Sequence, residues 1–111
     1  MSSSRKNART HSRIPFVSPI RLSWEDSAVP RFASGKCLDI SQGGLHVEIT
    51  QEIPVGTRVM LRVEKLKLTG PAVVKHVARR GGKFDLGLEL SQALHEQTLA
   101  AIRERLEPFR D

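Results

Sequence analysis

The feature that most constrains the fold is an alternation of apolar and polar residues, with a period of two, that recurs along most of the chain. It is clearest at residues 83–90, where every second residue is Phe or Leu. Such alternation is typical of a half-buried β-strand. Five more segments fit a strand, by alternation or by β-branched content: residues 20–25, 31–40, 45–50, 58–64 and 73–78. Six regularly spaced strands predict a mainly β fold, an antiparallel barrel or sandwich, because a long sheet must cover its edges or close.

A predicted turn interrupts the alternating pattern at residues 41–44, and a predicted helix follows its end at Leu90. The segment Ser41-Gln42-Gly43-Gly44 predicts a hairpin turn, since glycine readily takes positive φ. After Leu90 the period becomes helical, and Ser91 is a suitable N-cap for a helix over about residues 91–107. The apolar positions of that helix are Leu94, Leu99, Ile102 and Leu106. We expect this stripe to cover the barrel or an oligomer interface.

The net charge of +6 is concentrated at the N-terminus. Residues 1–13 contain four basic residues and no acid, whereas the remainder has 14 basic and 12 acidic residues, which is +2. Residues 1–13 are too polar to bury a core, so we interpret them as a flexible basic arm and residues 14–111 as one domain. A local excess of this kind favours an anionic partner, such as a phosphate, a nucleotide, nucleic acid or a membrane surface.

Several function classes are disfavoured by what the sequence lacks. Cys37 is the only cysteine, which excludes an intrachain disulfide and favours a reducing, cytoplasmic location. No apolar run is long enough to cross a bilayer, so we expect no membrane insertion. Cys37, Asp39 and Ser41 have no histidine at recognisable triad spacing. The histidines are scattered, at positions 11, 46, 76 and 95. We therefore expect no metal site, no cofactor and no enzymatic activity.

Two segments together carry the groups that would bind a guanine nucleotide. The guanidinium forks of Arg9 and Arg13 can pair with phosphate or with the guanine O6/N7 edge. The carboxylate of Asp39 can accept from guanine N1 and N2 hydrogens. The hydroxyl of Ser41 and the backbone N–H of Gly44 can cradle a phosphate. Taken singly, the arginines also fit a solvated tail and residues 39–44 fit an ordinary hairpin turn; the combination favours a ligand site.

Three segments in this order resemble the PilZ domain of bacteria: Arg9-Thr10-His11-Ser12-Arg13-Ile14-Pro15, Asp39-Ile40-Ser41-Gln42-Gly43-Gly44 and Phe84-Asp85-Leu86-Gly87-Leu88-Glu89-Leu90. The resemblance covers nearly the whole chain. It implies a six-stranded antiparallel β-barrel with a C-terminal helix that binds cyclic di-GMP, with the arginine arm folding over the ligand. It further implies that Arg9 and Arg13 contact guanine edges and phosphates, while Asp39, Ser41 and Gly44 form the barrel side of the site.

The same motifs leave details of the site open. The pair Arg5 and Arg9 has the same spacing as Arg9 and Arg13, although the Ile14-Pro15 that follows Arg13 resembles the usual exit of the family into its first strand. Many relatives carry a further arginine where this chain has Ala8, which weighs against a stacked ligand dimer and leaves one or two ligands per site open. Gly43 lies between motif positions and is expected to serve the turn.

The resemblance predicts a second-messenger receptor that relays cyclic di-GMP to an unidentified effector protein. In this hypothesis the ligand gathers Arg9 and Arg13 onto the barrel motif, and the effector recognises the rearranged surface. One alternative is a ligand-free interaction module of the same fold. Another is a small basic barrel for single-stranded nucleic acid, which needs exposed aromatic platforms. The available rings are Phe16, Trp24, Phe32, Phe84 and Phe109, and several fall on apolar strand positions, so we expect no nucleic-acid binding.

Overall fold

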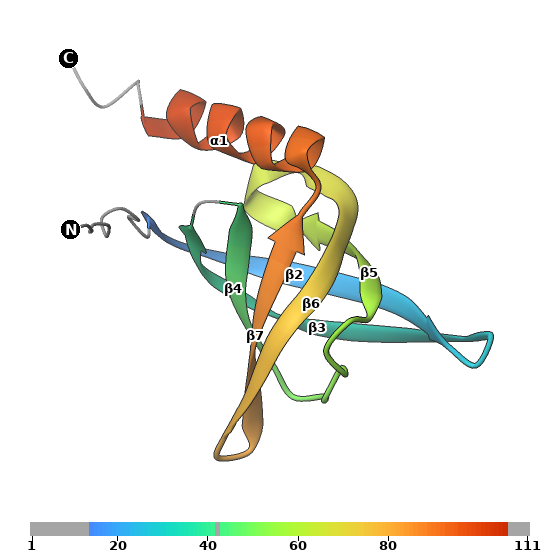
Figure 1. The fold of residues 1–111 in the computed structure, drawn as a ribbon. Helices are drawn as coiled ribbons and strands as arrows, with labels where there is room; N and C mark the ends of the chain where they lie inside the picture. The colour runs from blue at the N-terminus through green and yellow to red at the C-terminus, as the bar shows by residue number, and fades with distance from the viewer. Residues whose placement is uncertain (1–13, 42, 107–111) are drawn as a thin grey trace, which may run out of the picture.

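Six antiparallel strands close into a barrel (Figure 1). The period-two pattern predicted a barrel or a sandwich, and the barrel is the architecture that the family resemblance implied. The computed structural model of the chain describes residues 14–41 and 43–106. Its elements are β2 (Ile14–Asp26), β3 (Val29–Ser41), β4 (Gly44–Ile49), β5 (Arg58–Val63), the 3-10 turn η2 (Glu64–Leu66), β6 (Leu68–Arg80), β7 (Lys83–Leu90) and α1 (Gln92–Leu106). The order around the barrel is β2-β3-β4-β7-β6-β5. The predicted arm, residues 1–13, lies outside the described residues.

The barrel interior is filled by the aliphatic residues of the alternating pattern. On β4, Leu45, Val47 and Ile49 are buried, and their neighbours His46 and Glu48 are only partly covered. The other strands also bury alternate residues, apart from interruptions in β2, β3 and β6, and their apolar faces meet in one core. The barrel closes where β2 pairs with β5, from Ile20 to Ser23 on the β2 side. This closure removes the free edges that an open sheet would present.

Two hairpins extend beyond the region where all six strands pair (Figure 1). In the β2–β3 hairpin, Asp26 pairs with Val29, which leaves Ser27 and Ala28 as a two-residue turn. Both turn residues have positive φ, 53° and 68°, as a right-twisted hairpin with so short a loop requires. The β6–β7 hairpin turns at Gly81-Gly82. The β2–β3 ribbon therefore projects as two strands that are paired only with each other near their tip.

The helix α1 covers the barrel, which confirms one of the two roles expected for its apolar stripe. Its first turn is capped by Ser91, whose Oγ accepts from the N–H of Leu94 at 3.2 Å. The buried face is Leu94, Thr98 and Ile102, which pack over β6, β7 and η2. Thr98, not Leu99, occupies the central position because residues at i, i+4 and i+8 share a face. Its hydroxyl donates to the carbonyl oxygen of Leu94 at 2.8 Å.

The predicted stripe also included Leu106, whose side chain lies outside the described residues, as does Pro108. In the described part of the chain, no helix is long and apolar enough to cross a membrane.

Candidate ligand-binding site

A β-bulge in β3 positions the carboxylate of Asp39. Cys37 pairs with Val47 of β4, yet the next pair is Asp39 with His46, so Leu38 is an extra residue. The extra residue shifts the alternation, and both Cys37 and the later Ile40 are buried. As a result Asp39 stands directly opposite His46 at the end of the strand. Bulges of this kind commonly re-aim side chains beside functional sites.

Two further bulges lie near the same end of the barrel. In β6 the register moves between Val74 and His76, which makes Lys75 the extra residue and places His76 opposite Gly87. In β2 it moves between Pro15 and Ser18. Regular pairing is therefore interrupted on three strands near the motif.

Asp39 belongs to a chain of neighbouring acidic and basic side chains. Its Oδ2 lies 3.3 Å from Nδ1 of His46, while its Oδ1 is buried without a hydrogen-bond partner in the described part of the chain. On the other side, Nε2 of His46 lies 3.9 Å from Oδ1 of Asp85. Asp85 is only 4% exposed, and Arg80 Nε approaches its Oδ2 to 2.9 Å as an ion pair. His46 is thus held between two carboxylates and orients that of Asp39.

The turn that follows is fixed from two sides. The N–H of Gly43 donates to Nδ1 of His95 on α1 at 3.3 Å, and its carbonyl oxygen accepts from the N–H of Leu90 at 2.9 Å. Gly43 has φ 81°, which favours glycine. Gly44 is required for a different reason, because a Cβ there would collide with the carbonyl oxygen of Leu88. Both glycines therefore have structural roles, and the turn is rigidly joined to the helix.

These residues line one recess of about 280 Å³. Its lining is Asp39, Ser41, Gly43, Gly44, Leu45, His46, Lys75, His76, Gly87, Leu88 and Glu89. Asp39, Ser41 and Gly44, the three residues that the sequence placed on the barrel side of the site, therefore line one recess, together with Gly43 of the turn. Among the described residues, no group of three or more His, Cys, Asp or Glu is arranged to hold a metal ion.

Two histidines and a lysine of the recess, His46, His76 and Lys75, were not predicted from the sequence. His46 could have been found, because it follows Gly44 by two residues on the returning strand of the predicted hairpin. Lys75 and His76 reach the recess through the β6 bulge, which has no sequence signal. The ring of His76 fits there because Gly87 has no Cβ in its way. Lys75 also pairs with Glu89 at 3.6 Å, so the recess carries charges of both signs.

The arginine side of the predicted site, Arg5, Ala8, Arg9 and Arg13, lies outside the described residues. What the structure describes is the point where that segment joins the barrel. Ile14 pairs with Ile40, and Pro15 pairs with Asp39. The chain therefore enters the barrel beside the motif. Arg13 immediately precedes Ile14 in the sequence, and Ile14 pairs with Ile40, the residue that follows Asp39.

Cys37 lies beneath the motif and is a core residue, as expected for a small strand residue. Its thiol is fully buried and donates to the carbonyl oxygen of Asp39, with Sγ 3.8 Å from that oxygen. Burial, together with the smaller effect of the Asp39 charge, raises the pKa of the Cys37 thiol from 9.0 to about 12. A thiol with so high a pKa is a poor nucleophile at neutral pH.

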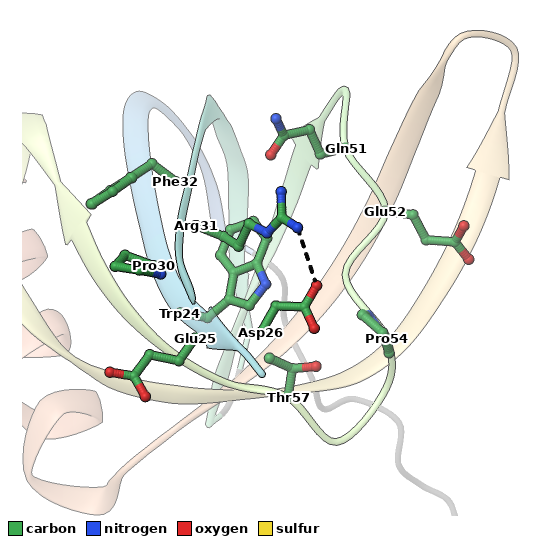
Figure 2. Close-up of a pocket in the computed structure, with 10 residues that line it drawn as sticks. All are labelled: Trp24, Glu25, Asp26, Pro30, Arg31, Phe32, Gln51, Glu52, Pro54 and Thr57. Atoms are coloured by element: carbon green, nitrogen blue, oxygen red, sulfur yellow. Dashed lines mark ion pairs between the residues drawn. The ribbon is translucent and has the colours of Figure 1, made fainter. Parts of the chain in front are cut away.

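A second, larger hollow of about 620 Å³ lies at the other end of β3, between the β2–β3 ribbon and residues 51–57 (Figure 2). Trp24 lines it and packs partly against the core, as predicted for its strand position. Arg31 and Asp26 form an ion pair of 3.6 Å within it. Since Arg31 and Asp39 are eight residues apart on one strand, about 25 Å separates the two hollows. The motif residues line only the smaller one.

The fold and the sequence both match known proteins. A family model described as PilZ domain matches residues 5–107. The fold is similar to that of MrkH of K. pneumonia in its apo state, with a TM-score of 0.63 and 13% identity over 98% of this chain and 55% of that chain. It is also similar to the PilZ domain of YcgR from Escherichia coli with c-di-GMP, with a TM-score of 0.59 and 15% identity over 92% and 97% of the two chains. The chain thus spans about half the length of MrkH. No curated protein matches it.

Proposed function

The chain belongs to the PilZ domain family, and on that premise we propose that it is a receptor for cyclic di-GMP. The observation that carries the proposal is the recess formed by Asp39, Ser41 and Gly44, which opens beside the point where the arginine-bearing segment joins the barrel. A fold similar to this one, the PilZ domain of YcgR, binds c-di-GMP.

The barrel side of the site supplies acceptors for guanine and donors for phosphate. The carboxylate of Asp39 is oriented by His46 and faces the N1 and N2 hydrogens of a guanine. The hydroxyl of Ser41 and the N–H of Gly44 bind phosphate oxygens at the turn. Lys75 adds positive charge at the rim of the recess, and the ring nitrogens of His76 can hydrogen-bond a phosphate oxygen, which favours a diester dianion over a neutral ligand.

The arginine side completes the site. Arg13 adjoins Ile14, and Arg9 precedes Ile14 by five residues, a distance of at most about 18 Å of extended chain. Both guanidinium groups are therefore within reach of the recess. We propose that they close over the ligand with bidentate hydrogen bonds to guanine edges and phosphates.

In this proposal, ligand binding changes the surface that the domain presents to other proteins, and the domain catalyses no reaction. Binding draws residues 1–13 onto the barrel, and an effector protein recognises the surface that results. We assign the domain no catalytic step, no cofactor and a cytoplasmic location. Of the four described aromatic rings, Phe16, Trp24 and Phe84 pack partly against the core, and Phe32 alone is largely exposed. One exposed ring does not make the row of stacking platforms that a groove for single-stranded nucleic acid needs.

The test is isothermal titration of cyclic di-GMP into the full chain, with cyclic di-AMP and GTP as control ligands. We expect saturable binding of cyclic di-GMP alone, and the stoichiometry decides between one ligand and two. Arg9→Ala and Arg13→Ala should each weaken binding at least tenfold, because a hydrogen bond to a charged group contributes about 1.5–3 kcal/mol.

Two control variants remove the same kinds of side chain, an arginine and a carboxylate, at positions outside the proposed site. Arg103→Ala removes an exposed arginine on α1, and Asp26→Ala removes a carboxylate in the other hollow. Both should bind as the wild type does. If the Arg9→Ala/Arg13→Ala protein binds as tightly as the wild type, the proposed site is wrong. If the wild type binds no cyclic di-GMP, the receptor function is wrong.

A further inference from the structure

The side chain of His95, near the start of α1, contacts the turn of the ligand motif. Its Nδ1 accepts a hydrogen bond from the N–H of Gly43 at 3.3 Å, across a separation of 52 residues in the chain. Among residues 14–41 and 43–106, the His95 ring has no other polar partner. We call Ser41, Gly43 and Gly44, which line the recess, the motif turn.

The direction of this hydrogen bond fixes the position of the ring proton. A backbone N–H can only donate, so Nδ1 of His95 has to present a lone pair to Gly43. In the neutral imidazole the proton then lies on Nε2. The contact therefore depends on an acceptor at one defined atom of the side chain, and this requirement distinguishes Nδ1 from Nε2.

The helix holds His95 in place because it is seated closely on the barrel. Leu94 is 3% exposed and packs so tightly on β6 that a Cβ added at Gly70 would collide with its side chain. The N–H of His95 donates to the carbonyl oxygen of Ser91 at 2.8 Å, within the capped first turn. Figure 1 shows α1 lying across the end of the barrel at which β7 ends. His95 thus extends from an element whose own position is fixed.

Hydrogen bonds, and not packing, hold Gly43. The position of its absent Cβ is surrounded by open space. Its carbonyl oxygen accepts from the N–H of Leu90 at 2.9 Å, and its N–H donates to His95. The bond to Leu90 involves backbone atoms alone, whereas the second bond needs a suitable side chain at position 95. The His95 bond is therefore the part of this attachment that depends on the identity of a side chain.

We infer that His95 is a positioning residue for ligand binding at the motif turn. This inference rests on the proposed function, because it gives His95 a share in the affinity of the same recess for cyclic di-GMP. His95 does not line the recess, so it acts through Gly43 and not by touching the ligand. It fixes the peptide group that carries the Gly43 N–H and so keeps Ser41 and Gly44 in place before the phosphate arrives. A turn that is ordered beforehand binds more tightly, because its ordering no longer opposes binding.

Three substitutions at position 95 separate the acceptor from the ring. H95N places an oxygen acceptor close to the position of Nδ1 and should keep the bond to Gly43. H95Q places its acceptor near the position of Nε2, and H95L has no acceptor, so both should lose the bond. In isothermal titration with cyclic di-GMP, H95Q and H95L should raise the Kd about 3- to 10-fold, as expected for one neutral hydrogen bond, and H95N should stay within about twofold of the wild type.

The control is Q97L, which makes the same apolar replacement at an exposed position of α1 and should bind as the wild type does. H95Q keeps a polar side chain at this half-buried position, so the test does not depend on the folding of H95L alone. The inference is overturned if H95Q and H95L bind as tightly as the wild type, or if H95N binds as weakly as they do.

A measurement without ligand separates this inference from the proposed function. Hydrogen exchange of the Gly43 amide, followed by NMR, should be about fivefold faster in H95Q and H95L than in the wild type and H95N, because the amide loses its acceptor. Equal exchange in all four proteins would overturn the inference even if cyclic di-GMP bound. If the wild type bound no cyclic di-GMP, the proposed function would be wrong, and the exchange pattern would still decide whether His95 holds the motif turn.

Discussion

Cys37 reports on the packing directly beneath the proposed ligand site. Because burial raises the pKa of its thiol from 9.0 to about 12, the thiolate fraction at pH 8 falls about a thousandfold relative to an unfolded chain. Iodoacetamide should therefore modify Cys37 at least a hundred times more slowly in the native protein than in concentrated urea. Mass spectrometry over time measures both rates. A native rate within tenfold of the unfolded one would show that the strand beneath the motif opens readily.

Gly44 and Gly87 both line the recess, but a Cβ added at each position would meet different atoms. Gly44→Ala forces a Cβ against the backbone carbonyl of Leu88, which cannot move without breaking the β4–β7 pairing. Gly87→Ala meets only the ring of His76, which is exposed and can rotate away. Urea denaturation should show a loss of about 1–3 kcal/mol in the free energy of unfolding for Gly44→Ala and a clearly smaller loss for Gly87→Ala. Equal losses would mean that the close approach at Gly44 does not limit the fold.

Among the elements, α1 links the turn of the motif to the rest of the barrel, and its stability depends on its first turn. Ser91→Ala removes the side-chain acceptor of the Leu94 N–H and should lower the free energy of unfolding by about 1 kcal/mol. The control is Gln92→Ala, one residue further on, which removes an exposed side chain and should change stability by less than about 0.5 kcal/mol. A Ser91→Ala protein as stable as the Gln92→Ala protein would contradict the cap.

The strands and the helix could be predicted from sequence because hydrophobic period is a local property. Leu86, Leu88 and Leu90 show the phase of β7 by themselves. The bulges could not be predicted. Leu38 and Lys75 are extra residues only relative to the strands that pair with them, and pairing is not visible in a single strand. Half of the recess depends on these bulges, which is why His76 and Lys75 were missed while Asp39, Ser41 and Gly44 were found.

Taken as a whole, the barrel has two hollowed ends, and the proposed function assigns the ligand to one of them. The end with the motif is smaller, carries charges of both signs and adjoins the entry of the arginine segment. The opposite end is larger and is lined by Trp24 with the Arg31–Asp26 ion pair. Size alone would favour the larger hollow. Chemistry favours the smaller one, because its carboxylate, hydroxyl and glycine turn lie beside Ile14, where the arginine-bearing segment enters the barrel.

The most direct test of this assignment is a ¹⁵N–¹H NMR titration of the full chain with cyclic di-GMP. The two ends have separate reporters, since Gly43 and Gly44 lie at the motif and Trp24, the only tryptophan, gives a single indole signal at the other end. We expect the amides of Gly43, Gly44 and His46 to shift with the ligand, and the Trp24 indole to stay in place. Movement of the Trp24 signal without movement at Gly43 and Gly44 would contradict the proposed site.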